Sequence, residues 1–255
     1  MILAIDIGNT NIVVGGYEGA ELRFCARVST DAARTEFEYA VVLKEILGLH
    51  GFPPDSIEGA IISSVVPPLS PVMRHAVRLV QPVKTLMVGP GIKTGLNIRI
   101  DNPGGLGADL LSTAIGAMEK YPLPVVIIDL GTATKITVVD EQRSFLGGAI
   151  MPGVMIGLKA LADCTAQLPQ INLDDEVKHP IGSNTIDCMK SGVILGAASM
   201  IEGMVRRYRA ALGSGVTVVA CGGLAGVVIP YCECEIIRDD HLLLDGLLAL
   251  YNRNS

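Results

Sequence analysis

Short apolar runs alternate with segments of helical periodicity along most of this chain, which predicts strands joined by helices. Strands that alternate with crossover helices are typical of an α/β fold. The expected strands span residues 2–6, 12–17, 21–28, 59–66, 85–88, 124–130, 135–140, 144–150 and 216–221. The expected helices span residues 35–48, 69–80, 107–120, 153–163, 187–212 and 241–252.

One unit of this pattern occurs twice. The segment AIDIGNTNIVVGGYEG at 4–19 is similar to IIDLGTATKITVVDEQ at 127–142: in both, an apolar strand runs into Asp-x-Gly, a few small residues and a second β-rich segment. Asp6 and Asp129 lie close to half the chain length apart. The repeat predicts a duplicated fold with halves at roughly 1–115 and 116–255, and a site in the cleft between them.

The repeated Asp-x-Gly turn has two interpretations. Aspartate, asparagine, glycine and threonine are ordinary hairpin-turn residues, and a single copy would be explained in that way. Such a turn also lets backbone N–H groups and small polar side chains approach phosphate oxygens, while the carboxylate holds a cation directly or through water. Because the aspartate and the glycine recur at matching places, the repeat favours a pair of phosphate-binding loops.

Composition narrows the classes of partner. The 255-residue chain is 49% hydrophobic and has a formal net charge of −6. Its basic residues are scattered, so it offers no basic patch for nucleic acid or for an anionic membrane, and a small molecule is the expected partner. The first residues form a core strand and not a leader, so we expect a cytoplasmic protein.

Several other sites have no support in the sequence. The six cysteines form no C-x-x-C pair and the four histidines fall in no zinc-binding pattern. GPGIKTG at 89–95 lacks the spacing of a P-loop, and no G-x-S-x-G elbow occurs. The uncharged run at 210–232 contains glycines and a proline, so it is expected to be a buried strand followed by a glycine loop and not a membrane span.

The two loops resemble those of the superfamily of sugar kinases, actin and heat-shock chaperones, and further motifs resemble type III pantothenate kinases. These motifs are DIGNTN at 6–11, SVVP at 64–67, GPGIKTGL at 89–96, DNP at 101–103, GAD at 107–109, DLGTAT at 129–134, GGAIMPG at 147–153, LPQ at 168–170, IGSNT at 181–185, GG at 222–223 and LLLDGL at 242–247. The resemblance implies a duplicated ribonuclease H-like (actin-like ATPase) fold. It also implies ATP-dependent phosphorylation of pantothenate to 4'-phosphopantothenate, the first step of coenzyme A biosynthesis.

The resemblance further implies roles for individual residues. Asp109 matches the catalytic base, and Gly107, Ala108, Leu110 and Thr185 match positions in the pantothenate pocket. Asp129 matches the ligand of a monovalent cation, K⁺ or NH₄⁺, and Mg²⁺ accompanies ATP. The residues that match the ATP contacts are Asp6, Ile7, Gly8, Asn9, Thr10, Asn11, Ile12, Val13 and Thr132. A homodimer is implied as well.

Other readings remain open. Asp109 is also well placed to be the N-cap of a helix over 110–120. The motif G-A-D-R of the resembled family has Leu110 in place of its arginine, which removes a bidentate donor to an anionic group. Ile100, Lys135 and Cys221 also depart from that family's pattern. A catalytically impaired binding paralogue and a kinase of another small hydroxylated substrate are therefore the alternatives.

Overall fold

The computed structural model describes residues 1–173, 176–213 and 215–255. The chain forms two compact units. The first contains Met1–Leu96, Asp101–Glu119 and Leu242–Ser255, and the second contains Asn97–Ile100 and Lys120–His241. The expected boundary at 115/116 falls inside a helix of the first unit, and the C-terminal helix belongs to the first unit and not to the second.

The first unit is built on a five-stranded sheet with the order β3-β2-β1-β4-β5. The strand β1 pairs antiparallel with β2 and parallel with β4, and it therefore lies in the middle of the sheet. The bounds are β1 Ile2–Ile7, β2 Asn11–Glu18, β3 Glu21–Ser29, β4 Gly59–Ser64 and β5 Lys84–Met87. Buried on both faces, β1 and β4 are nearly continuous apolar runs.

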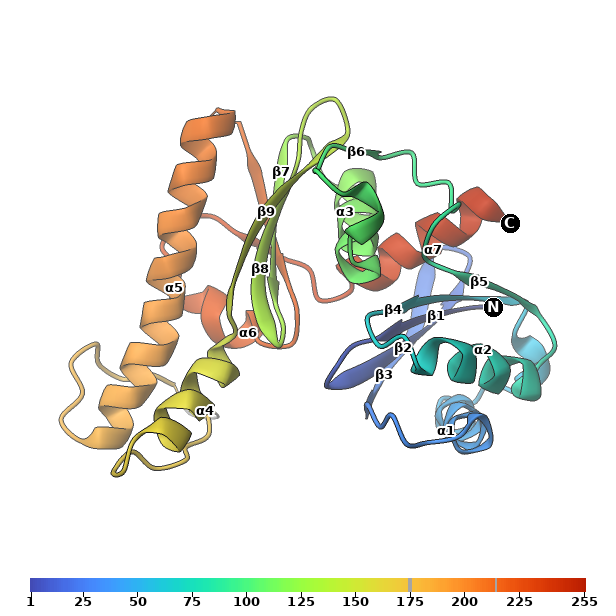
Figure 1. Cartoon of the computed structure of the whole chain (residues 1–255), viewed down its shortest axis with the longest axis horizontal. Coiled ribbons are helices and arrows are strands. Elements are labelled where there is room, and N and C mark those ends of the chain that lie inside the picture. The colour runs from blue at the N-terminus through green and yellow to red at the C-terminus, as the bar shows by residue number, and fades with distance from the viewer. Residues whose placement is uncertain (174–175, 214) are drawn as a thin grey trace. The chain divides into compact units, whose positions relative to one another are not determined.

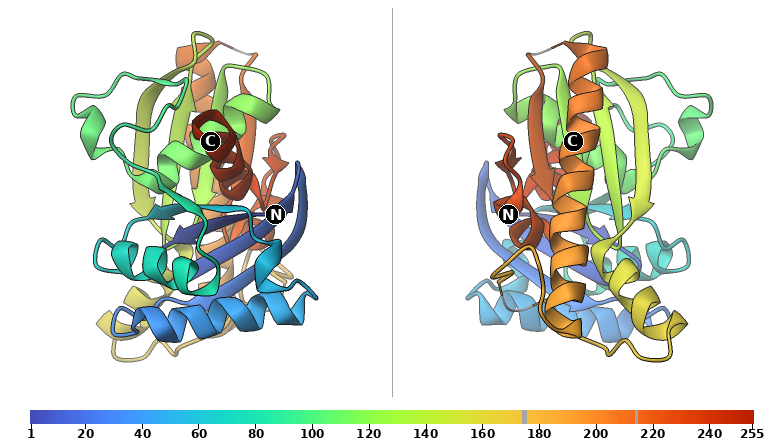
Figure 2. Two further views of the ribbon diagram at one scale, coloured as in Figure 1. Left: turned by 90° about the vertical axis from the view of Figure 1, so that its right-hand side faces the viewer. Right: turned by 90° about the vertical axis from the view of Figure 1, so that its left-hand side faces the viewer.

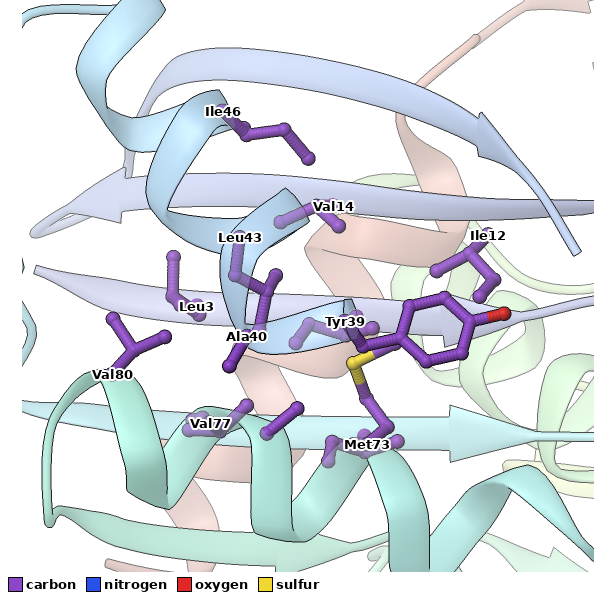
Figure 3. Packing of buried hydrophobic residues seen from close by; sticks show 14 of the residues in the cluster. Leu3, Ile12, Val14, Tyr39, Ala40, Leu43, Ile46, Met73, Val77 and Val80 are labelled. Atoms are coloured by element: carbon purple, nitrogen blue, oxygen red, sulfur yellow. The ribbon is translucent and has the colours of Figure 1, made fainter. Parts of the chain in front are cut away.

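Helices α1 (Glu36–Leu49) and α2 (Leu69–Val80) pack together across one face of this sheet (Figures 1 and 2). Their buried residues interlock with alternate residues of β1 and β2, as Figure 3 shows for Leu3, Val14, Leu43 and Val77. Because side chains alternate along a strand, Ala4 and Asp6 point to the opposite face. Helix α1 begins at a capping box, in which the Thr35 side chain accepts from the Glu38 N–H.

The opposite face of the sheet is covered by α7 (Leu242–Asn254), which contacts β1 and β4. The Tyr17 hydroxyl donates to the Asp245 carboxylate over 2.6 Å. Helix α3 (Ala108–Lys120) packs on α7 through two glycines. A Cβ at Gly246 would lie 1.8 Å from the Ser112 carbonyl oxygen, and a Cβ at Gly116 would lie 2.2 Å from the Leu242 carbonyl oxygen.

The second unit repeats the first sheet. Its order is β11-β10-β7-β8-β9-β6, so that β9-β8-β7-β10-β11 matches β3-β2-β1-β4-β5, strand for strand and direction for direction. The strand β6 adds to the edge of β9. The bounds are β6 Asn97–Ile98, β7 Val125–Leu130, β8 Ala133–Val139, β9 Ser144–Pro152, β10 Thr217–Cys221 and β11 Ile237–Arg238. The duplicated ribonuclease H-like fold is thus confirmed.

Helices α4 (Val154–Cys164), α5 (Thr185–Leu212) and α6 (Ala225–Val228) accompany this sheet. Helix α5 lies along it (Figures 1 and 2) and contributes Ala198, Ile201 and Val205 to the core over Val126 and Ile128. Within the described ranges, α5 is the one helix long and apolar enough to cross a membrane, and 39% of its apolar window is buried. Core helices pass the same test, so this is weak evidence for a span.

The nine expected strands and six expected helices are all present, with ends displaced by at most two residues. The structure also contains the short elements β6, β11 and α6 and three 3₁₀ turns, which the sequence pattern does not predict. Those turns are η1 Pro54–Ser56, η2 Pro103–Gly105 and η3 Ile229–Tyr231. The uncharged run at 210–232 forms the end of α5, β10 and a glycine turn, except for residue 214, which lies outside the described residues.

The contact between α3 and α7 gives a stability prediction. We expect Gly246→Ala to lower the free energy of unfolding by about 2 to 4 kcal/mol, because the added methyl group meets a backbone carbonyl that cannot rotate away. Gly48→Ala is the matched control, because a Cβ at this helical glycine has nothing within 4 Å. Denaturant unfolding measures both variants, and equal midpoints for Gly246→Ala and the wild-type chain would contradict the close approach.

Candidate functional site

The first Asp-x-Gly loop connects β1 to β2 and is held by backbone hydrogen bonds. The Gly8 N–H donates to the Asn11 carbonyl oxygen over 3.0 Å, and the Thr30 hydroxyl donates to the Gly8 carbonyl oxygen over 2.6 Å. The Thr30 N–H donates to the Thr10 carbonyl oxygen over 3.0 Å. A Cβ at Gly8 would lie 2.9 Å from the Asn11 carbonyl oxygen, so the turn needs glycine there. The loop is therefore a fixed backbone cradle.

The side chains of this loop divide into two groups. Asn9 and Thr10 are exposed. Ile7 and Ile12 are fully buried in the core. These two isoleucines, although they match ATP contacts by resemblance, can therefore offer a ligand only their backbone. Val13 and Asn11 are partly exposed.

Asp6 stands one residue before the end of β1. It is paired in register with Val13 of β2 and with Ser63 of β4, and paired residues of neighbouring strands point to one face. Ser63 is fully buried, and its hydroxyl makes no hydrogen bond within the described part of the chain. No sequence motif points to Ser63, because only strand pairing brings it beside Asp6.

The second Asp-x-Gly loop connects β7 to β8 and contains Asp129, Gly131 and Thr132. Asp129 is paired in register with Lys135, and the Lys135 Nζ lies 2.8 Å from the Asp129 Oδ2. Both side chains are mostly buried: 18% of the Lys135 side chain and 17% of the Asp129 side chain are exposed. Thr132 is exposed at the tip of the turn. This loop thus carries an internal ion pair that the sequence alone could not orient.

Two glycines from other segments support the second loop. Gly222, at a φ of +94°, follows β10, and a Cβ there would lie 2.7 Å from the Asp129 Oδ1. The Leu224 N–H donates to the Leu130 carbonyl oxygen over 3.0 Å. A Cβ at Gly153, just before α4, would lie 1.9 Å from the Thr132 carbonyl oxygen. The GG and MPG motifs therefore serve close backbone packing around the Asp129 turn.

Cys221 ends β10 and is paired in register with Asp129. Burial raises the pKa of its thiol well above the usual value, and the nearby Asp129 carboxylate raises it further. The thiol therefore stays protonated and neutral beside the loop. It is not a candidate nucleophile, since the thiolate is the reactive form.

The monovalent cation that the family resemblance implies at Asp129 does not fit the residues present. One carboxylate oxygen holds the Lys135 ammonium, and the other faces the backbone at Gly222. A metal cation sharing this carboxylate would sit about 4 Å from the ammonium, and like charges at that distance repel by about 4 kcal/mol near a protein surface. The Lys135 ammonium therefore disfavours a metal ion at Asp129.

Asp109 lies in the first turn of α3, which begins at Ala108. The helix thus starts before Asp109, and the Leu111 N–H donates to the Gly107 carbonyl oxygen over 3.0 Å. The alternative of Asp109 as the N-cap of a helix over 110–120 is wrong, because Gly107 precedes the helix. A Cβ at Gly107 would lie 2.5 Å from the Asp109 Oδ1, so the glycine leaves room for the carboxylate.

The other predicted pocket residues are divided between the units. Leu110 is half-buried in the first turn of α3, and with Gly107, Ala108 and Asp109 it belongs to the first unit. Thr185 is the first residue of α5 in the second unit, directly after the N-cap Asn184. Ile100 contacts Gly147 in the second unit: a Cβ at Gly147 would lie 3.5 Å from its Cγ2.

No group of three or more histidine, cysteine, aspartate or glutamate side chains within residues 1–173, 176–213 and 215–255 could hold a metal ion. A Mg²⁺ ion that enters with a phosphate ligand keeps several waters and uses only one or two protein carboxylates. Asp6 at the first loop is a carboxylate of that kind.

Comparisons with known proteins agree with these motifs. A sequence model of the family described as type III pantothenate kinase matches residues 2–207. A type III pantothenate kinase of Brevibacillus brevis is 42% identical over 254 residues, which covers 100% of this chain and 99% of the relative.

Solved structures show the same fold at low identity. A Campylobacter jejuni protein assigned to the Baf family of transcriptional activators matches with a TM-score of 0.63 at 17% identity, over 99% of this chain and 98% of the other. A ROK family glucokinase from Streptomyces griseus, in complex with glucose and AMPPNP, matches with a TM-score of 0.51 at 12% identity, over 98% of each chain. From the family match and the full-length identity, the chain belongs to the type III pantothenate kinase family.

Proposed function

We propose that this chain transfers the γ-phosphoryl group of ATP to the hydroxyl of pantothenate and so forms 4'-phosphopantothenate and ADP for coenzyme A biosynthesis. The observation that carries this proposal is the 42% identity to a type III pantothenate kinase over the whole chain. The two Asp-x-Gly loops at equivalent places of matching sheets support ATP use. The Streptomyces griseus glucokinase, which has the same fold, is solved with an ATP analogue.

The two loops would bind the phosphates of ATP. Residues 6–13 offer the backbone N–H groups and the exposed polar side chains of the first loop, and Thr132 offers its hydroxyl at the tip of the second. Mg²⁺, when bound, neutralises charge on the transferred phosphoryl group. The Asp6 carboxylate would hold that ion directly or through water.

Asp109 would act as the base. Its carboxylate accepts the proton of the pantothenate hydroxyl, whose oxygen forms a bond to the γ-phosphorus as the bond to the β-phosphate oxygen breaks. Because phosphoryl transfer passes through a loose transition state, the carboxylate mainly orients the hydroxyl. Gly107, Ala108, Leu110 and Thr185 would complete the pantothenate pocket, and the space that Gly107 leaves beside the Asp109 Oδ1 supports this assignment.

We also propose a cytoplasmic homodimer. The support for an interface is a set of exposed apolar side chains at the end of β9 and on α4: Ile150, Met155 and Ile156 are 74%, 47% and 46% exposed. The three residues lie close together in the sequence, and a contiguous exposed apolar patch marks an interaction site more often than scattered residues do. A two-fold axis through it would pair α4 with its copy.

The role of Asp109 can be tested by one atom exchange. We expect Asp109→Asn to lower turnover by at least about 10²-fold while ATP affinity stays unchanged, because an amide cannot accept the hydroxyl proton. Coupled ADP release measures turnover, and calorimetric titration measures ATP binding. Asp55→Asn, an exposed aspartate of η1, is the control. Full turnover in Asp109→Asn would remove the base from Asp109.

Leu110 separates a competent kinase from the impaired paralogue. If the missing guanidinium limits substrate binding, Leu110→Arg adds a charge-assisted contact of about 1.5 to 3 kcal/mol and raises kcat/KM for pantothenate about ten- to a hundredfold. Leu110→Met, which keeps an apolar side chain, is the control and should match the wild-type chain. Paired measurements of ADP release and pantothenate affinity check the prediction.

Other outcomes for Leu110→Arg point elsewhere. Tighter pantothenate binding without ADP release in either protein would favour the impaired paralogue. A competent wild-type enzyme that the arginine harms would show that an unpaired charge is being buried and that Leu110 is not a weak point. Turnover with a different hydroxylated substrate would favour the remaining alternative.

The proposed interface predicts an oligomeric state. We expect a dimer by light scattering at micromolar concentration, and a monomer when Met155 and Ile156 are both changed to glutamate, because the charges cannot be buried against a copy of themselves. Phe37→Glu is the control, since this α1 side chain is 65% exposed in the other unit. A wild-type monomer, or a dimer that survives the double change, would contradict the proposed surface.

A further inference from the structure

We infer that the ammonium group of Lys135 takes the place of a monovalent metal cation at the second phosphate loop, so that this kinase works without K⁺ or NH₄⁺. The inference rests on the proposed function and concerns how its second loop is neutralised. It reverses what the family resemblance alone implies for Asp129.

Strand pairing places Lys135 beside Asp129. It lies on β8 directly opposite Asp129 of β7, and residues so paired point to the same face of the sheet. Its Nζ is 2.8 Å from the Asp129 Oδ2, within the range of a charge-assisted hydrogen bond. Only 18% of the lysine side chain and 17% of the aspartate side chain are exposed, so the pair is weakly screened by salt.

The two halves of the chain differ in the residue that lies opposite the loop aspartate. In the first half, the residue paired in register with Asp6 is Val13, which carries no charge. In the second half, the equivalent residue is Lys135. The duplicated scaffold thus places a positive charge of the chain itself opposite one of its two loop aspartates and an uncharged side chain opposite the other.

Both oxygens of the Asp129 carboxylate have close neighbours within the chain. The Oδ2 carries the ammonium, and the Oδ1 lies so close to Gly222 that a single Cβ there would come within 2.7 Å. A metal ion at either oxygen of this carboxylate would lie near the Lys135 ammonium and be repelled by it. A tethered ammonium is a compact point charge that needs no binding from solution, so it holds this place at every salt composition.

The experiment compares salts that differ only in their cation. Initial rates of ADP release with ATP, Mg²⁺ and pantothenate are measured in potassium, ammonium and choline chloride at equal ionic strength, for the wild-type chain, Lys135→Met, Lys135→Arg and Lys44→Met. The change to methionine keeps most of the lysine's length and removes its charge. Lys44 is an exposed lysine of α1 in the other unit and is the matched control.

We expect the wild-type chain, Lys135→Arg and Lys44→Met each to turn over equally fast in all three salts. Lys135→Met should lose about 10²-fold in choline, since it lacks a fixed charge beside the transferred phosphoryl group, and should recover most of that rate in K⁺. Activation of the wild-type chain by K⁺ or NH₄⁺ would overturn the inference, and so would a Lys135→Met variant that is fully active in choline.

A second readout does not depend on turnover. Melting temperatures are measured in the same salts with Mg²⁺ and ADP, and a cation that binds the native state raises them. K⁺ should raise the melting temperature of Lys135→Met over its value in choline and leave that of the wild-type chain unchanged. A K⁺-specific rise in the wild-type chain overturns the inference.

The two readouts separate two kinds of failure. A wild-type chain without turnover of pantothenate in any salt would contradict the proposed function, while the melting temperatures would still decide the role of Lys135. If Lys135→Met does not fold, the wild-type chain and Lys135→Arg decide, because the inference requires both to be indifferent to K⁺.

Discussion

The pairing of a central strand with one antiparallel and one parallel neighbour is the constraint on which the rest of the structure depends. It is made twice, by β1 between β2 and β4 and by β7 between β8 and β10. Each central strand buries one face under helices and carries, one residue before its end, an aspartate on the other face. The two sheets thereby place Asp6 and Asp129 at equivalent positions. Strand pairing alone fixes these positions, and no side-chain contact is needed for it.

Close backbone packing fixes what surrounds these strands. In the first unit, Gly246 and Gly116 let α7 and α3 approach to backbone contact, and α3 carries Asp109 in its first turn. In the second unit, Gly222 and Gly153 bring two separate segments against the Asp129 turn. In an interior packed this densely, a single added methyl group strains the surrounding structure. The fold therefore requires glycine at these positions as strictly as it requires the polar residues near them.

The two halves have diverged in charge and not in topology. Matching strands occupy matching positions in both sheets. At the position opposite the loop aspartate, one half has the uncharged Val13 and the other has Lys135, which makes an ion pair with Asp129. A duplicated scaffold can thus bind similar groups at both loops and still neutralise them differently, because one substitution on a neighbouring strand changes the local field more than it changes the fold.

The sequence by itself determined the longer helices and strands, the duplication and the family, because apolar periodicity, Asp-x-Gly repetition and ordered motifs are local properties of the chain. The sequence also placed Asp109 at the start of a helix, but as a possible N-cap and not within the first turn, since the exact end of a helix depends on its caps. Only the tertiary structure placed α7 with the first unit, set Ser63 beside Asp6 and aimed Lys135 at Asp129. Those three facts depend on strand register and helix packing between residues far apart in the chain, which no local pattern encodes.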